Sequence, residues 1–183
     1  MSAALPTPGS WVIDPSHSTV GCVARHLMVS KVRGRFTSFS GTVVVGDPLE
    51  DSSVTVSIDA ASFTTGDEQR DAHVLSGDFL DVEDFPTLTF EGSEPRRQGD
   101  DWVLPGLLTI RGTTRPVELE VEALGVITDP WGNPKAALSA TAEIDREEFG
   151  ITWNAALEAG GVLVGPKVRI ELDVQLAPAP QEA

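Results

Sequence analysis

The chain has 183 residues, of which 40% are hydrophobic, and its 28 acidic and 13 basic side chains give a net charge of −15. This length and composition predict one well-buried domain, and no apolar run approaches the roughly 20 residues that a membrane helix needs. The negative charge argues against binding to nucleic acid, whose phosphates it would repel, and against docking on anionic lipid by charge.

The two ends of the sequence are predicted to be disordered tails, over residues 1–9 and 178–183, with a single domain over residues 10–177 between them. The N-terminal segment has no basic residue and no apolar block, so it lacks the composition of a secretory signal. Cys22 is the only cysteine, which excludes an internal disulfide bond and fits a reducing compartment. We therefore expect a cytoplasmic protein.

Alternation of apolar and polar residues recurs along the chain and is typical of half-buried antiparallel strands. It is clearest in residues 116–128, where Val117, Leu119, Val121 and Ala123 share one face and glutamates share the other. The remaining predicted strands lie at residues 10–14, 18–25, 39–45, 54–58, 87–94, 102–110, 135–145 and 168–176.

The segments between the strands contain few regular elements. Residues 26–35 are rich in basic side chains and are predicted to form a turn or a short helix. One α-helix is predicted at residues 67–76, because acidic residues at its start and Gly77 after its end suit the helix dipole and the C-terminal cap. This helix lies in the strand-poor segment 60–86, whose length is typical of a lid or another functional segment. A short helical turn is expected at residues 146–149.

About eight strands at hairpin spacing, without alternating helices, predict an all-β fold. An extended up-and-down antiparallel β-barrel fits best, because closure removes both exposed sheet edges, and a β-sandwich is the alternative. Long strands and small inward residues favour a bore that holds one long, thin, apolar ligand, and a solid core stays open as the alternative. The small inward residues are Gly92, Gly106, Ala123, Ala136, Ala140 and Ala142.

Five strings stand out in the sequence: DPSHSTV (14–20), HLMVSKVRGRF (26–36), DAHVLSGDFLDVEDFPTLTF (71–90), LTIRGTTRPV (108–117) and FGITWN…GGVLVG (149–165). Together they resemble the YceI family, from about Trp11 to Leu176. The resemblance implies a lipocalin-like extended β-barrel that holds a polyisoprenoid chain, such as an isoprenoid quinone or a polyprenyl phosphate, in a central tunnel. It also implies a homodimer. Many members of the family are periplasmic and carry a signal peptide, which this sequence does not show.

Large apolar side chains on the predicted inward faces, in the lid and near the last loop are the candidates for lining the tunnel. They are Phe36, Phe39, Phe63, Phe79, Phe85, Phe90, Leu108, Ile110, Leu119, Phe149 and Trp153. A dense basic cluster is the candidate for holding a phosphate or quinone head group at the barrel mouth, since arginine matches phosphate oxygens. Its members are Arg25, His26, Lys31, Arg33 and Arg35. The alternative for this cluster is a solvated loop with local ion pairs.

The three histidines, His17, His26 and His73, have acidic residues near them in the sequence. A metal site would need three or four converging ligands, and no zinc-type spacing is present. Structural hydrogen bonds are therefore favoured, and no metal is expected. Around the predicted helix, a network that joins Arg70, Asp71 and His73 and braces the lid is favoured over acid–base catalysis.

The sequence contains no nucleophile elbow, phosphate loop, dinucleotide-binding fingerprint or H-E-x-x-H motif. We therefore expect a non-enzymatic carrier whose ligand is a long isoprenoid lipid, with no other cofactor, no nucleic-acid partner and no stable membrane insertion. An enzyme that uses the histidines and aspartates on an apolar substrate is one alternative. A structural dimer with a filled barrel is the other.

Overall fold

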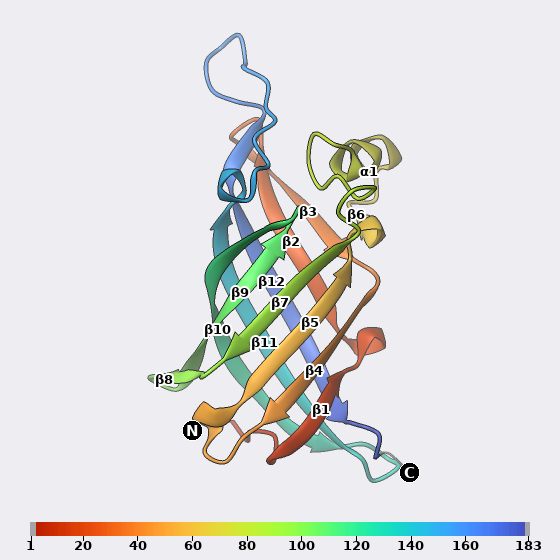
Figure 1. The fold of residues 1–183 in the computed structure, drawn as a ribbon, viewed down its shortest axis with the longest axis vertical. Coiled ribbons are helices and arrows are strands. Elements are labelled where there is room, and N and C mark those ends of the chain that lie inside the picture. The colour runs from red at the N-terminus through yellow and green to blue at the C-terminus, as the bar shows by residue number, and fades with distance from the viewer. Residues whose placement is uncertain (1–2, 182–183) are drawn as a thin grey trace.

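The computed structural model describes residues 3–181, which form a closed antiparallel β-barrel with one α-helix beside one end (Figure 1). The strands are β1 (Gly9–Ile13), β2 (Thr19–His26), β3 (Ser30–Phe36), β4 (Phe39–Val45), β5 (Ser53–Asp59), β6 (Phe63–Thr64), β7 (Thr87–Ser93), β8 (Arg96–Gln98), β9 (Asp101–Ile110), β10 (Thr113–Thr128), β11 (Pro134–Asp145) and β12 (Val164–Pro178). The helix is α1 (Glu68–Leu75), and short 3-10 helices lie at Pro15–His17, Leu49–Asp51, Ala60–Ser62 and Arg146–Phe149. The predicted all-β class is confirmed.

The predicted tails fall partly outside this range, since residues 1–2 and 182–183 are not among those described. Within it, Pro6 is buried, and the indole N–H of Trp11 donates a hydrogen bond to the carbonyl of Thr7 (2.9 Å). The segment just before β1 therefore packs on the barrel. No helix in the described range is both long enough and apolar enough to cross a membrane.

The twelve strands occupy eight positions around the barrel, because four positions hold two short strands in line. The strands in line are β1 with β2, β3 with β4, β5 with β6, and β7 with β8. Each of the eight positions is hydrogen-bonded to the position before it and the position after it along the chain. The pairing of β1 with β12, which places Ile13 opposite Leu176, joins the first position to the last and closes the ring. The up-and-down barrel is therefore confirmed, and the alternative sandwich is excluded.

The last strand, β12, shows most simply how the sequence makes an inside and an outside. Val168, Ile170, Leu172, Val174 and Leu176 point into the barrel, as their alternation predicts. Charged and amide side chains occupy the positions between them on the outer wall. The same alternation in the other strands produces an apolar interior inside a polar wall.

β10 contains a β-bulge that the sequence analysis did not anticipate. Its register against β11 shifts between Ala123 and Gly125. Leu124 is the extra residue and points outward, with 52% of its surface exposed, and the shift after it brings Val126 to the interior opposite Ala136. The long strand therefore keeps an apolar inner face on both sides of the bulge.

The prediction of a turn or short helix at residues 26–35 is wrong. This segment is the end of β2, a tight turn and most of β3, with His26 paired to Ser30. Alternate residues of β3 point inward, and basic side chains occupy the outer positions between them. The sequence analysis missed this strand because a central glycine, Gly34, and the basic outer residues obscure its period of two.

A compact cluster of buried side chains closes the end of the barrel near which the chain termini lie (Figure 1). Its members are Trp11, Ile13, Val45, Ala136 and Leu176. Ala136 and Leu176 have no exposed surface at all. We call this cluster of buried apolar side chains the floor of the barrel.

Replacing Leu176 by alanine should lower the free energy of unfolding by about 3 kcal/mol, because it opens a cavity in this fully buried floor. Leu124→Ala, the same change at the exposed bulge, should alter it by less than about 0.5 kcal/mol. Urea unfolding of both variants, followed by tryptophan fluorescence, measures the difference. Equal losses would contradict the assignment of inner and outer faces.

Candidate functional site

The barrel encloses a cavity of about 660 Å³ that is lined mainly by apolar side chains. Its size lies within the range of about 300–1,000 Å³ that is usual for small-molecule sites. The cavity extends from the floor, where Leu176 borders it, to the end beside α1, where His73 borders it. Cys22 is part of the wall, and burial raises the pKa of its thiol to about 11, so the thiol stays neutral. This cavity excludes a barrel filled end to end by side chains.

Nine of the eleven side chains predicted to line the bore border this cavity. They are Phe36, Phe63, Phe79, Phe90, Leu108, Ile110, Leu119, Phe149 and Trp153. These residues come from strands, the lid segment 60–86 and the segment before β12, and closure of the sheet brings them together. Their contact with a ligand stays a prediction.

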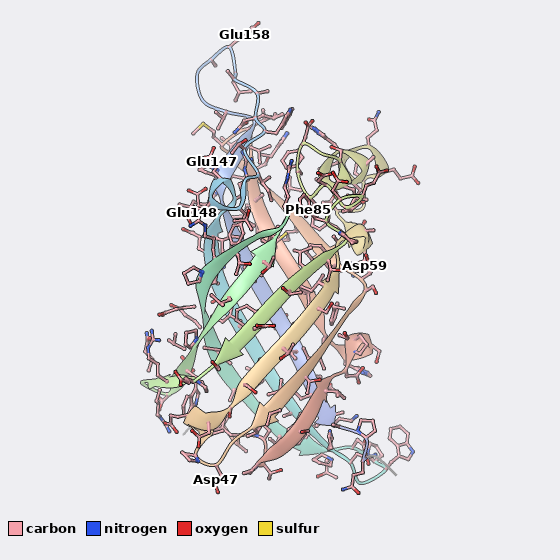
Figure 2. All side chains as sticks on the ribbon, viewed as in Figure 1. Asp47, Asp59, Phe85, Glu147, Glu148 and Glu158 are labelled. Atoms are coloured by element: carbon pink, nitrogen blue, oxygen red, sulfur yellow. The ribbon has the colours of Figure 1, made fainter. Side chains whose placement is uncertain are left out.

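The other two predicted residues, Phe39 and Phe85, do not border the cavity. Phe39 is the first residue of β4 and packs against the floor. It also packs against a second cluster of buried side chains, which includes Ile58 and Leu88. Phe85 lies at the rim, where its ring packs against Gly112 in the turn between β9 and β10 (Figure 2). Both rings therefore support the wall and the rim, a role that an aromatic residue in the sequence does not distinguish from cavity lining.

The small inward residues do not all create space. Gly92 and Gly106 are paired between β7 and β9, and the ring of Phe90 lies where their side chains would be. Phe63 covers Gly34 in the same way. Glycine here lets an aromatic ring approach the wall closely. The open space therefore comes from the diameter of the barrel more than from missing side chains, contrary to the sequence argument.

Most of the polar side chains that border the cavity belong to the end beside α1. They are Arg25, His26, Thr65, Asp67, Gln69, Arg70, His73 and Arg146. Asp67, Gln69 and Arg70 are also exposed to solvent, so the cavity opens between them and the barrel wall. We call this opening the mouth. An apolar bore with a polar mouth suits a ligand that has a long apolar tail and a polar end.

Asp71 holds α1 to β6, which in turn pairs with β3. Its carboxylate accepts hydrogen bonds from the hydroxyl of Thr64 and from the hydroxyl and the N–H of Thr65, each 2.7 Å long. Burial raises the pKa of Asp71, but these hydrogen bonds outweigh burial and hold the pKa below its ordinary value. Arg70 adds a hydrogen bond from its Nε to the Thr65 hydroxyl (2.7 Å). Arg70 and Asp71 therefore meet at Thr65 and brace the lid. His73 does not join them, so the predicted network of three residues is present only in part.

His73 joins the lid to the segment that precedes β12. Its ring packs edge-on against Phe79 and Trp153, with centroid separations of 5.0 and 4.6 Å. Its Nε2 lies 2.9 Å from a carboxylate oxygen of Asp78. His73 and Phe79 belong to the lid, whereas Trp153 belongs to the loop before β12. The three rings therefore connect the lid to that loop across the mouth.

Arg146 fastens the other side of the mouth and is buried, with 4% of its surface exposed. Its guanidinium donates hydrogen bonds to the carbonyls of Ile151 (2.8 Å), Trp153 (3.0 Å), Val164 (3.2 Å) and Gly165 (3.0 Å). Burial lowers the pKa of this guanidinium, yet arginine stays charged at neutral pH. Four carbonyl dipoles therefore hold a cation at the edge of the cavity.

Asn154 joins the two ends of the loop that precedes β12. Its amide nitrogen donates to the carbonyl of Val164 (2.7 Å), and its amide oxygen accepts from the N–H of Val164 (3.0 Å). The sequence analysis anticipated neither Asn154 nor Arg146. Arg146 stands beside acidic residues in a short helical turn, a pattern typical of exposed residues, so nothing in the local sequence indicates that it is buried.

The residues of the basic cluster that was predicted to hold a head group lie on both sides of the barrel wall. Arg25 and His26 border the cavity near its mouth. Lys31, Arg33 and Arg35 occupy outward positions of β3, where Arg33 forms an ion pair of 2.9 Å with a glutamate of β12. Successive residues of a strand point to opposite faces, so these three cannot reach into the bore and the prediction is wrong for them.

The histidines do not converge on one site. His17 is exposed on the turn between β1 and β2, where it lies 3.0 Å from Asp14. Hydrogen bonds from Ser16 and His17 lower the pKa of Asp14 to about 2. His26 and His73 border the cavity from different elements. Within residues 3–181, no three His, Cys, Asp or Glu side chains are placed to hold a metal ion together.

A closed up-and-down barrel with an apolar bore, packed at one end and open at the other, places the protein in the lipocalin-like class of β-barrels. A family model described as YceI-like domain matches residues 11–176. The chain therefore belongs to the YceI-like family, which confirms the resemblance seen in the sequence.

A UPF0312 protein of Staphylococcus aureus (strain USA300) is 36% identical over 174 residues, which cover 92% of this chain and 97% of the relative. The crystal structure of Burkholderia cenocepacia BcnA matches with a TM-score of 0.76 and 24% identity, over 89% of this chain and 98% of BcnA. A polyisoprenoid-binding domain from Saccharophagus degradans, implicated in plant cell wall breakdown, matches with a TM-score of 0.71 and 12% identity, over 92% and 98% of the two chains. At these identities the two solved structures establish the fold alone.

Asp71→Ala should loosen the lid, because it removes the hydrogen bonds that hold α1 to β6. At neutral pH, hydrogen-exchange mass spectrometry should show about tenfold faster exchange in the helix and the residues that follow it. Glu68→Ala, at an exposed position of the same helix, is the matched control and should leave exchange unchanged.

The contribution of Asp71 should also depend on pH. A carboxylate whose pKa is lowered by folding stabilises the fold above its ordinary pKa, here 3.8, and loses this contribution as the pH falls through the lowered value. The difference in unfolding free energy between wild type and Asp71→Ala should therefore be full at neutral pH and should shrink as the pH falls from about 4 through the lowered pKa. Denaturant unfolding across the acid range measures this, and a constant difference would contradict it.

Proposed function

We propose that this protein is a non-enzymatic carrier that holds one long isoprenoid lipid, such as an isoprenoid quinone or a polyprenyl phosphate, in its barrel. The observation that carries the proposal is the apolar cavity of about 660 Å³, with a packed floor and a polar mouth. Membership of the YceI-like family supports the same ligand class, as does the likeness in fold to a polyisoprenoid-binding domain.

Apolar area is sufficient to bind such a ligand without a specific polar contact. Each buried methylene contributes about 0.8 kcal/mol, so a tail of roughly twenty-five methylene equivalents supplies about 20 kcal/mol. This value already reaches the practical limit of non-covalent affinity, so the lost freedom of the tail must offset a large part of it. Polar groups at the mouth are then needed for orientation more than for affinity.

The packed floor favours a lipid that enters with its tail first. Its head group would then remain at the mouth, among the donors of Arg25, His26, Arg70 and His73. The charge of Arg146 at the cavity edge adds positive potential there. A phosphate or a quinone carbonyl accepts hydrogen bonds from such groups, so both head groups fit the proposal.

The alternative of an enzyme has weaker support. His73 and Asp78 form a hydrogen-bonded pair beside the mouth, but the same histidine ring is packed between Phe79 and Trp153. The pair of His17 with its aspartate lies on an exposed turn away from the cavity lining. Acid–base chemistry on a bound tail would need these groups in reach of one substrate atom.

A homodimer and a cytoplasmic location belong to the proposal as predictions. The single cysteine fits a reducing compartment, and Cys22 contributes a neutral thiol to the cavity wall. The family resemblance suggests the homodimer. Native mass spectrometry of purified protein reads the subunit number and the mass of a bound lipid together.

Freshly purified protein should contain an isoprenoid species, detected by native mass spectrometry and by lipid extraction. A stripped preparation should take up an added isoprenoid quinone in an amount that approaches one molecule per barrel. Repeated preparations that carry no lipid and take up no quinone would contradict the proposal.

Ala140→Trp should reduce bound lipid at least about tenfold, because Ala140 borders the cavity on β11 and an indole ring there fills much of the bore. Ala137→Trp is the matched control, since Ala137 lies on the opposite face of the same strand. Lipid content is compared at equal protein concentration, with circular dichroism to verify folding. Equal lipid content in both variants would place the ligand outside the bore.

A further inference from the structure

The open end of the barrel carries three exposed apolar residues, Leu27, Met28 and Val29, in the turn between β2 and β3. We call them the tip, and their exposed fractions are 43%, 59% and 78%. His26, the preceding residue, borders the cavity, so the tip stands beside the mouth. Three successive exposed apolar side chains on a turn mark a contact surface.

The backbone conformation of the turn does not favour large apolar side chains at these positions. Leu27 and Met28 have φ angles of 52° and 63°, in the left-handed region. Asn, Asp and Gly adopt this conformation more easily than bulky residues and are usual in hairpin turns. Two large apolar residues therefore occupy strained positions, which is typical of functional sites.

A second apolar segment lies against the tip. The N–H of Leu27 donates to the carbonyl of Leu163 (2.8 Å), and a side chain on Gly161 would collide with the sulfur of Met28. Residues 150–163 form the loop before β12, which is drawn in blue in Figure 1 and extends furthest from the barrel at this end. The single charged residue in this loop, Glu158, lies at its outer end (Figure 2). The tip and the loop thus form one largely apolar protrusion.

Positive charge adjoins the tip in a chain whose net charge is −15. Arg25 and Lys31 are paired across the hairpin, and Arg33 and Arg35 follow on the outer face of β3. No acidic residue interrupts β2, the turn or β3. Arg33 is partly neutralised by Glu171, which leaves Lys31 and Arg35 for a partner. The net charge of the chain therefore does not describe this face.

We propose that this face docks on the surface of an anionic lipid bilayer, with the tip inserted at the boundary between head groups and acyl chains. Apolar side chains flanked by arginine and lysine are the combination that holds peripheral proteins at this boundary. The inference rests on the proposed carrier function. Docking here places the mouth against the membrane, so that the apolar tail of a lipid moves between bilayer and barrel without crossing water.

Sedimentation with lipid vesicles measures this docking. Wild-type protein should bind vesicles of phosphatidylcholine mixed with phosphatidylglycerol, and should bind pure phosphatidylcholine vesicles more weakly. Met28→Glu should weaken binding at least about tenfold, because a charge replaces an inserted apolar side chain. Trp131→Glu is the matched control and should leave binding unchanged, since Trp131 is 83% exposed in the turn between β10 and β11 at the opposite end of the barrel.

Two further variants test the electrostatic part in opposite directions. Lys31→Gln should weaken binding to the anionic vesicles about fivefold, and Glu158→Gln should strengthen it by about the same factor. Both effects should shrink as salt is added, because exposed charges are screened. Val29→Glu, at the most exposed position of the tip, repeats the Met28 test if that variant does not fold by circular dichroism.

No wild-type binding, or equal losses in Met28→Glu and Trp131→Glu, would overturn the docking proposal. So would a Met28→Glu variant that keeps its vesicle binding but loses a homodimer in size-exclusion chromatography, because the tip would then be a self-association surface. Lipid extraction from the same preparations separates docking from the carrier function. Bound lipid without vesicle binding rejects docking alone, and vesicle binding without bound lipid rejects the carrier function alone.

Discussion

The pairing of β1 with β12 is the contact on which the rest of the structure depends. Its residue pairs, from Trp11 with Pro178 to Ile13 with Leu176, are continued by the pairing of β12 with β2, and together they turn a sheet with two edges into a closed wall. Once the wall is closed, the two-residue period assigns each side chain to the inside or the outside. Trp11, Ile13 and Leu176 are also members of the floor, so closing the barrel and packing one end of it involve the same side chains.

Four of the eight positions in the barrel wall contain two short strands in line, separated by a break in the chain's regular structure. The two strands of such a position lie at different heights along the barrel axis. At the first break, Asp14 caps the 3-10 helix between β1 and β2 by accepting a hydrogen bond from the N–H of Ser16 (3.0 Å). β1 and the end of β4 contribute to the packed floor, whereas β2, β3 and β6 lie at the level of the mouth. The breaks after β1 and before β4 therefore each let one strand position serve a solid end and a hollow end.

The sequence predicted the features that depend on alternation and missed those that depend on tertiary hydrogen bonds. The inner face of β12, the helix α1 and the closed barrel follow from period and capping residues, and all are present. The bulge beside Leu124 and the burial of Arg146 leave no periodic signal, because each is fixed by residues distant in sequence. The side chains of Phe39 and Phe85 were misplaced for a related reason: an aromatic residue packs equally well in a wall, a rim or a bore.

The two ends of the barrel differ in what holds them, and this difference determines where a ligand can pass. The floor is held by fully buried apolar packing, whose opening would expose side chains such as Leu176 to water. The mouth is held by half-exposed contacts, including the rings of His73 and Trp153 and the hydrogen bonds of Asp71. Such contacts open at a lower free-energy cost than a buried core. Widening of the mouth therefore requires only local separation of the lid from the segment that Arg146 anchors, while the hydrogen-bonded ring of strands stays closed.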